Sequence, residues 1–311
     1  MNPEISIIIV NYNRCDLLTN CLKSILDNPP KRTFEIIVVD NAGTDNSVQN
    51  VEQNFKNVKL IKNQTNRGFA AANNQAIRQA CGKFILFLNS DTIVLKNAID
   101  SLAEFLEKKP QAALCAPKLL NTDGSLQPNV YHFTTFRSIL ARYTIFKYLG
   151  LFKKSRDFYK MRGFSYDAII QIDRPMGAAM MAVKNALEKI SNFDENFFFY
   201  FEDADLCLRL KKTGLEIYFI PNAQIIHIGQ ASSKSLGSHK TDMMFYKSML
   251  HYFRKHKGRF NTFLFSLIFK PTALLYYLIE VIVNLIMFHR LEKSKSAALF
   301  LSRFLPEFLF C

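Results

Sequence analysis

Several signatures that would place this 311-residue chain in a common class are missing from its sequence. No G-x-G-x-x-G follows the first apolar run and no G-x-x-x-x-G-K-[ST] occurs, which excludes the usual dinucleotide fingerprint and the P-loop. The six cysteines form no C-x-x-C pair and have no zinc-type spacing, so we expect ordinary buried thiols in a reducing, cytosolic compartment. The N-terminus lacks the basic and apolar regions of a signal peptide.

Acidic residues are scarce relative to basic ones. Asp and Glu number 26 against 40 Lys and Arg, which gives a formal net charge of +14. Such an excess favours polyanionic partners, whether nucleic acid, anionic lipid or phosphorylated small molecules, and the sign alone does not choose among them. The hydrophobic content of 49% supports a sizeable core and excludes a disordered chain.

The first 120 residues alternate short apolar runs with helical stripes. Four runs read as buried strands of a parallel sheet covered on both faces, at residues 5–10, 34–40, 58–62 and 84–89. Apolar residues at helical spacing over 18–26 and 69–80 predict two crossover helices between them. The sequence therefore predicts an α/β domain.

Ligands of such sheets bind beyond the carboxyl ends of the strands, where polar residues follow three of the runs. Asp40 there is placed to accept hydrogen bonds from a nucleotide base or ribose, or else caps its own loop. Asp91, in Asn89-Ser90-Asp91, is a candidate ligand of Mg²⁺ or Mn²⁺ shared with substrate phosphates. An ordinary turn is the alternative for that segment.

The densest polar signal lies in residues 193–209, where aromatic residues precede Glu202, Asp203 and Asp205 at the start of an expected helix. The helix dipole favours ionised carboxylates there. A deprotonated Asp is able to take a proton from an acceptor hydroxyl. The alternative is that these residues cap the helix and pair with Arg209 on its surface.

His227 lies between apolar residues, and a lone His in that setting is usually a core residue. It becomes a candidate metal ligand only where Asp91 lies nearby. The Gly-, Ser- and Lys-rich residues 229–240 suit a loop that closes over phosphates, and a plain solvated loop fits equally well.

Two further segments differ from the rest in composition. Residues 121–170 interleave Tyr, Phe, Arg and Lys without a clear period, so we expect an irregular, mobile insert that shapes an acceptor site. From residue 261 onward the apolar content rises, but Glu280 interrupts the one stretch near spanning length, 271–288. Basic residues on both flanks favour helices at an anionic membrane surface over a span or a helix packed on the domain.

In their order, these motifs resemble glycosyltransferase family 2 with the GT-A fold, especially its rhamnosyltransferase-like members. Seven segments between residues 5 and 232 carry the resemblance: Val10-Asn11-Tyr12-Asn13, Val39-Asp40-Asn41, Asn66 to Asn74 (NRGFAAANN), Asn89-Ser90-Asp91, Met176-Gly177-Ala178, Phe201-Glu202-Asp203-Ala204-Asp205 and His227. The resemblance implies a catalytic domain over 1–240, with the insert at 121–170, and a helical region over 241–311.

The resemblance also implies roles for individual residues. Donor-binding positions are Asn11, Asn13, Asp40, Asn66, Gly68, Asn73 and Ser90. Asp91 and His227 are implied as ligands of Mg²⁺ or Mn²⁺, and Asp203, beside Glu202, as the catalytic base. Asn89 departs from the usual D-x-D pattern, as it does in related rhamnosyltransferases.

The expected activity is inverting transfer of a sugar, above all L-rhamnose from dTDP-rhamnose, from a nucleotide-diphosphate donor to a lipid-linked glycan at the cytoplasmic face of the plasma membrane. It would serve O-antigen, capsule or cell-wall polysaccharide synthesis. UDP-hexose and galactofuranose donors stay open, as does a non-catalytic sugar-nucleotide-binding partner. A nucleotidyltransferase is disfavoured because no glycine follows the first strand at residues 11–14. Nucleic acid is not needed to explain the positive charge.

Overall fold

The computed structural model describes residues 2–229 and 238–286, and the chain divides into two compact units. The first unit consists of Met1–Tyr131, Gly163–Phe198 and Glu202–Ala231. The second consists of His132–Arg162, Phe199–Phe201 and Ser232–Cys311. The catalytic and C-terminal regions expected from the sequence stay predictions as functional domains.

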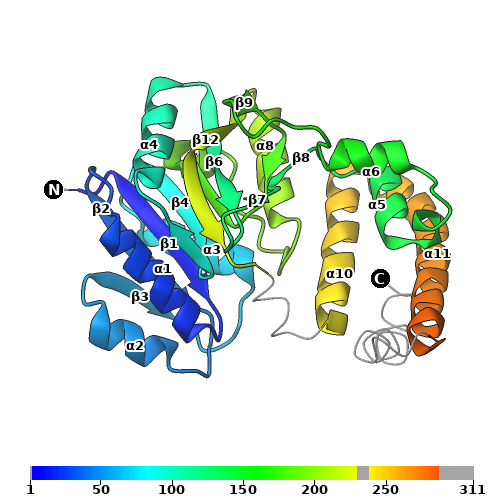
Figure 1. The fold of residues 1–311 in the computed structure, drawn as a ribbon, viewed down its shortest axis with the longest axis horizontal. Helices are drawn as coiled ribbons and strands as arrows, with labels where there is room; N and C mark the ends of the chain where they lie inside the picture. The colour runs from blue at the N-terminus through cyan, green and yellow to red at the C-terminus, as the bar shows by residue number, and fades with distance from the viewer. Residues whose placement is uncertain (1, 230–237, 287–311) are drawn as a thin grey trace. The chain divides into compact units, whose positions relative to one another are not determined.

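A mixed sheet forms the centre of the first unit (Figure 1). Its main strands run in the order β3 (Val58–Lys62), β2 (Phe34–Asp40), β1 (Ile5–Asn11), β4 (Phe84–Asn89), β11 (Ala179–Val183), β6 (Ala112–Leu120), β12 (Glu216–His227) and β5 (Thr92–Val94). β1 to β4 are parallel, β11 is antiparallel to both of its neighbours, and β12 is parallel to β6. The four strands predicted from the apolar runs are confirmed.

Short strands lie at the margins of this unit. β7 (Leu126–Gln127) pairs with β6, β9 (Ile170–Gln171) pairs with β12, and β8 (Val130–Tyr131) pairs with β10 (Arg174–Pro175) in a separate two-stranded sheet.

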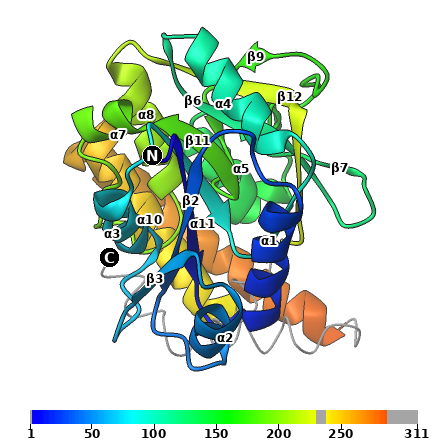
Figure 2. The same cartoon turned by 90° about the vertical axis from the view of Figure 1, so that its left-hand side faces the viewer.

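Helices cover both faces of the sheet, as the continuous apolar strands predict (Figure 2). One face carries α1 (Cys15–Asp27), α2 (Ser47–Asn54) and α4 (Ala98–Lys108). The other carries α3 (Phe69–Gln79), α7 (Lys184–Lys189) and α8 (Glu202–Lys212). Both crossover helices predicted from the sequence are therefore confirmed.

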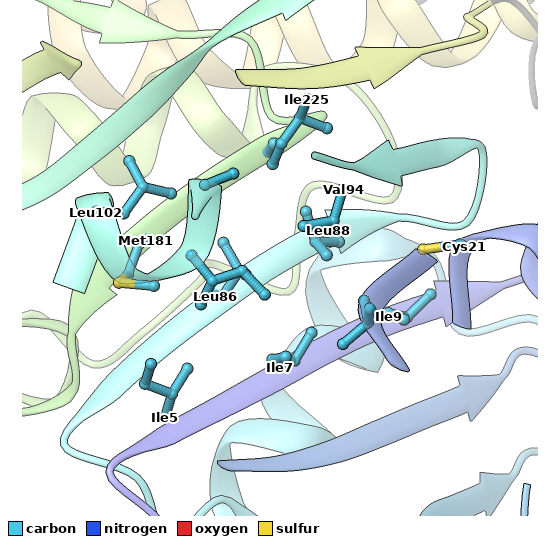
Figure 3. Packing of buried hydrophobic residues seen from close by; sticks show 14 of the residues in the cluster. Ile5, Ile7, Ile9, Cys21, Leu86, Leu88, Val94, Leu102, Met181 and Ile225 are labelled. Atoms are coloured by element: carbon cyan, nitrogen blue, oxygen red, sulfur yellow. The ribbon is translucent and has the colours of Figure 1, made fainter. Parts of the chain in front are cut away.

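Alternate residues of each strand enter one hydrophobic core, because successive side chains of a strand point to opposite faces. Ile5, Ile7 and Ile9 of β1 lie beside Leu86 and Leu88 of β4, all within 1% of complete burial (Figure 3). Full burial of each such side chain contributes roughly 1.5–3 kcal/mol. This core fixes the strand ends at which the polar residues lie.

The second unit is helical. It contains α5 (Phe136–Tyr143), the 3₁₀ helix η1 (Ile145–Lys147), α6 (Lys153–Tyr159), α10 (Ser238–Lys257) and α11 (Arg259–Ile286). The expectation of an irregular insert was wrong for residues 136–159. Hydroxyl caps start two of its short helices, since Thr135 and Ser138 form a capping box and Thr144 accepts from the Phe146 N–H. Helices this short form without a long apolar repeat, which is why the sequence pattern did not indicate them.

The C-terminal region contains one helix that is apolar and long enough to cross a membrane, Arg259–Val283, among the described residues. The predicted phosphate-closing loop, 229–240, lies mostly in 230–237, outside the described residues.

Candidate active site

Asn11 and Asp40 lie next to each other at the carboxyl ends of β1 and β2. The Asn11 amide nitrogen is 3.4 Å from Oδ1 of Asp40, and the Gly43 N–H donates to Oδ2 at 2.9 Å. Burial raises the pKa of the Asp40 carboxyl, although both hydrogen bonds act in the opposite direction. The buried Oδ1 of Asn11 has no hydrogen-bond partner within the described ranges. The pair thus presents acceptor oxygens at the strand ends, which suits the N–H groups of a base.

Asn13 holds the loop that follows β2. Its backbone is left-handed, with φ 53°, a conformation that Asn tolerates better than most residues. Its side-chain oxygen accepts from the backbone N–H groups of Thr44 and Asp45. The structure therefore brings Asn13 to the rim of the Asp40 region with its carbonyl oxygen already engaged.

Asn41 connects this loop with the segment before α3. Its Nδ2 donates to Oδ1 of Asn66 at 2.9 Å and to the Gly68 carbonyl at 3.2 Å, and its Oδ1 accepts from the Arg67 N–H at 3.0 Å. Asn66 also accepts from the Gly68 N–H at 3.0 Å. Asn66 and Gly68 thus lie beside Asn41 and hence next to Asp40.

Gly68 allows two backbones to meet. Its φ is +82°, and a Cβ there would lie 2.6 Å from the carbonyl oxygen of Phe198. The next N–H, of Phe69, donates to that same carbonyl at 2.7 Å. The predicted donor-side segment is therefore tied to the chain just before the acidic helix α8.

Asn73 and Asn74 are buried on α3. Asn73 donates to the Phe69 carbonyl within its own helix, so no hydrogen bond brings it to the other candidates. Asn74 instead binds both backbone groups of Phe193, at 2.9 and 3.1 Å. Its role is to hold the segment that leads to α8.

Asp91 and His227 lie together, as the metal-ligand hypothesis for His227 requires. Both are buried, and Oδ1 of Asp91 is 3.4 Å from Nε2 of His227. The pairing of β5 with β12 brings the two residues together, since His227 pairs with Thr92 and the Ile228 N–H donates to the Asp91 carbonyl. His227 is the last residue of β12.

Gln127 orients the His227 ring. Its Oε1 is 2.7 Å from Nδ1 of His227, and its Nε2 donates to the His227 carbonyl at 3.1 Å. Because Oε1 of Gln127 is an acceptor, Nδ1 of His227 carries the hydrogen, and in the neutral tautomer the lone pair is on Nε2, which faces Asp91. A buried carboxylate and an oriented imidazole nitrogen fit two protein ligands of a divalent cation. Among residues 2–229 and 238–286, no group of three or more acidic, His or Cys side chains gathers that could hold a metal ion, so Asp91 and His227 stand as a pair.

The Gly177-Ala178 dipeptide links this end of β4 to Asp203. The Asn89 N–H, which begins the Asn89-Ser90-Asp91 segment, donates to the Ala178 carbonyl at 2.9 Å. The Gly177 N–H donates to Oδ2 of Asp203 at 3.2 Å. Ser90, between Asn89 and Asp91, is buried. One backbone segment therefore fixes both the predicted metal side and the predicted base.

Arg174 forms an ion pair with Asp203, with 3.1 Å between Nη1 and Oδ2. The side chains are only 10% and 15% exposed, so water screens the pair weakly. The Ala204 N–H binds the other oxygen, Oδ1, at 2.6 Å. These contacts fix the position of the carboxylate at the first turn of α8.

The remaining acidic residues of α8 differ from Asp203. Asp205 pairs with Arg209 at 2.7 Å. For Asp205, the alternative interpretation from the sequence, pairing with Arg209, is therefore the one that the structure supports. Glu202 is buried, and burial together with the charge of Asp203 raises its pKa to about 8. Its Oε2 has no hydrogen-bond partner among residues 2–229 and 238–286. Glu202 therefore keeps its proton to a higher pH than an ordinary glutamate does, next to Asp203.

Sequence reasoning missed Gln127 and Arg174. Nothing in the sequence marks Gln127 as a partner of His227, because 100 residues separate the two and the residues around Gln127 resemble a polar loop. Arg174 stands three residues before the Gly177 motif, and that proximity was the available signal.

The mixed sheet flanked by helices, with polar side chains at the ends of its parallel strands, is the GT-A fold of glycosyltransferases. The sequence profile of Glycosyl transferase family 2 matches residues 6–181, and the chain belongs to this family. Both the fold class and the family expected from the sequence are confirmed.

The relatives include two rhamnosyltransferases. The chain is 25% identical over 242 residues to the N-acetylglucosaminyl-diphospho-decaprenol L-rhamnosyltransferase of Mycobacterium tuberculosis, covering 73% of this chain and 76% of the relative. It is 27% identical over 241 residues to the rhamnosyltransferase WbbL of Escherichia coli, covering 75% and 86%. The chain is thus a rhamnosyltransferase-like glycosyltransferase of polysaccharide synthesis.

Solved structures share the fold at lower identity. The mannosyltransferase PcManGT from Pyrobaculum calidifontis, in complex with GDP-Man and Mn²⁺, aligns with a TM-score of 0.58 and 16% identity over 100% of this chain and 84% of that one. Residues 1–349 of S. aureus TarS, in complex with UDP, align with a TM-score of 0.53 and 20% identity over 79% and 63%.

Proposed function

We propose that the chain is an inverting, metal-dependent glycosyltransferase that moves L-rhamnose from dTDP-rhamnose to a hydroxyl group of a lipid-linked glycan. The observation that carries the proposal is the Gly177-Ala178 link, which joins the Asp91–His227 end of the sheet to Asp203 through two hydrogen bonds. Sugar transfer needs the groups that stabilise the leaving diphosphate and the group that deprotonates the acceptor to be held close to each other. The two rhamnosyltransferase relatives support the choice of sugar.

Asp40 and Asn11 would bind the base of the donor. The Asp40 carboxylate or the Asn11 amide oxygen would accept from the imide N–H of thymine or uracil. Asn66, Gly68 and Asn13 would shape the same pocket through Asn41 and the loop after β2. UDP-hexose and galactofuranose donors are therefore the closest competitors of dTDP-rhamnose.

Asp91 and His227 would hold Mg²⁺ or Mn²⁺ together with the donor's diphosphate, near Ser90. The bound cation would stabilise the negative charge of the leaving nucleoside diphosphate. An imidazole ligand binds a transition-metal ion more readily than it binds Mg²⁺. We therefore favour Mn²⁺ over Mg²⁺.

Asp203 would act as the base. It would take the proton of the acceptor hydroxyl while that oxygen attacks the anomeric carbon, and the bond to the diphosphate would break with its electron pair. A single displacement inverts the configuration at that carbon. Glu202, whose pKa is raised by burial, would keep its own proton and leave the role of base to Asp203.

The positive charge fits a nucleotide diphosphate, a lipid-pyrophosphate acceptor and an anionic membrane, without nucleic acid. We place the protein on the cytoplasmic face of the plasma membrane as a peripheral enzyme, supported by the lipid-linked substrate in the name of the mycobacterial relative.

A thermal-shift screen tests the proposal. dTDP, UDP, GDP and CMP are each added with Mn²⁺, with Mg²⁺ and with chelator, to the wild type and to Asp91→Ala. A metal-dependent shift for dTDP that Asp91→Ala loses supports the proposal. A shift for UDP alone moves the donor to UDP-sugars, and no shift with any nucleotide sinks the enzymatic proposal.

A further inference from the structure

Helix α11 has a continuous apolar face that is open to solvent. The exposed residues recur at helical spacing from Phe260 to Val283, and their exposed fractions lie between 42% and 72%. We call this face the α11 stripe; its main members are Phe260, Phe263, Leu267, Leu275, Leu278 and Ile282. A surface of this kind on one helix marks an interaction site.

The opposite face of α11 is packed inside the second unit. Phe265 stacks on Phe136 of α5 with ring centroids 4.6 Å apart. The Tyr277 hydroxyl lies 3.0 Å from that of Tyr246 on α10. α10 and α11 lie side by side (Figure 1). Within the part of the chain that the structure describes, the stripe is therefore the face of α11 that stays uncovered.

Glu280, which argues against insertion when the sequence is read alone, lies on the packed side. The Tyr148 hydroxyl, just after η1, donates a hydrogen bond to its carboxylate, and the ring of Tyr148 stacks on Tyr276. Lys147 in turn donates to the Tyr276 hydroxyl at 3.1 Å. The carboxylate is thus satisfied by the protein and does not interrupt the stripe.

The chain around the stripe is positively charged. No Asp or Glu occurs from residue 243 to residue 279, and six Lys or Arg do. Four of them, Arg254, Lys255, Lys257 and Arg259, are exposed where α10 ends and α11 begins. Basic residues next to an exposed apolar face match the phosphates and acyl chains of an anionic lipid surface.

We infer that α11 lies in the plane of an anionic bilayer, with the stripe among the upper acyl chains and with α5, η1 and α10 on its aqueous side. The inference rests on the proposed attachment to a membrane and adds its surface and orientation. A span is disfavoured because α10, packed along α11, carries Lys247 and four basic residues in its last turn. Such a helix does not enter hydrocarbon.

Vesicle co-sedimentation of the full chain tests the surface. Leu267→Asp/Leu278→Asp should weaken binding to vesicles of phosphatidylcholine and phosphatidylglycerol by about a hundredfold or more, since two buried leucines are lost. The matched control, Leu26→Asp/Ile169→Asp, changes two equally exposed apolar residues of the first unit and should bind as the wild type does. The wild type should bind vesicles of pure phosphatidylcholine more weakly than it binds the anionic vesicles. Equal binding of both double variants would overturn the inference.

Single tryptophans test the orientation, because the chain contains none. Four variants each place one tryptophan on the stripe: Leu264→Trp, Leu267→Trp, Leu275→Trp and Leu278→Trp. With anionic vesicles, the tryptophan emission of every variant should shift to the blue, and brominated lipids with shallow bromine atoms should quench all four equally. A depth that rises and falls along the helix indicates a span and refutes the in-plane arrangement. Emission already blue-shifted without vesicles indicates that residues 287–311 or a second copy cover the stripe, which also refutes it. Metal-dependent nucleotide shifts in the same variants show separately whether the proposed donor site stands.

Discussion

The carboxylate of Asp203 is held by the guanidinium of Arg174, 3.1 Å away, in a place where both side chains are at least 85% buried. The arginine fixes the orientation of the carboxylate, and it donates to the same oxygen, Oδ2, that accepts from the Gly177 N–H. A base at this position therefore acts through the lone pairs that these donors leave free.

Asp203→Asn tests the role of this carboxylate. The amide preserves the shape but takes no proton, so kcat should fall by about 10² to 10⁴-fold. Nucleotide binding should stay within about twofold, measured by isothermal titration. Asp167→Asn, an exposed aspartate of the same unit, is the control and should keep full activity. An active Asp203→Asn enzyme would sink the assignment of the base.

Gln127→Leu tests the orientation of His227. Leu fills a similar volume but accepts no hydrogen bond, so the imidazole loses the partner that sets its tautomer. The apparent affinity for Mn²⁺, measured by titration in the presence of a saturating nucleotide, should fall about 10 to 100-fold. Gln171→Leu, on the edge strand β9, should leave this affinity unchanged. A Gln127→Leu protein with normal Mn²⁺ affinity but lower stability would make Gln127 a structural residue only.

Gly68→Ala and Gly124→Ala form a matched pair. Both glycines are left-handed, with φ near +82° and +81°, so an alanine costs roughly 1 kcal/mol at each. Only at Gly68 would the new Cβ also meet a backbone, 2.6 Å from the Phe198 carbonyl, whereas nothing lies within 4 Å at Gly124. Denaturant unfolding should show a loss of about 1 kcal/mol for Gly124→Ala and at least about 2 kcal/mol more for Gly68→Ala. Equal losses would mean that the segment moves away freely.

The strands and the two crossover helices were predictable because parallel strands buried on both faces are long apolar runs, and their bounds at residues 34–40 and 58–62 agree with the structure. The strand ends then located Asn11, Asp40 and Asp91. Each of these predictions depends only on local pattern and on the rule for parallel sheets.

Side-chain partners across long sequence separations were not predictable. The hydrogen bond from Gln127 to His227 depends on how β7 and β12 flank β6, and nothing local in either segment encodes it. The helices of residues 136–159 were missed for a different reason. They are too short for a hydrophobic period and rest on hydroxyl caps and aromatic contacts such as the one between Phe136 and Phe265.

Glu202→Gln tests the buried neutral carboxyl. Its pKa in the folded protein is about 8, against 4.5 as the ordinary value, because burial and the neighbouring charge of Asp203 disfavour ionisation. The stability that the neutral form provides is full below about pH 4.5 and is lost as the pH rises through about 8. The wild type should therefore lose a few kcal/mol across this window in urea unfolding, whereas Glu202→Gln should lose much less, since glutamine does not ionise. Glu188→Gln, at an exposed position of α7, should follow the wild-type curve. A Glu202→Gln protein with the wild-type pH dependence would show that Glu202 ionises in the folded state without cost, which would contradict the raised pKa.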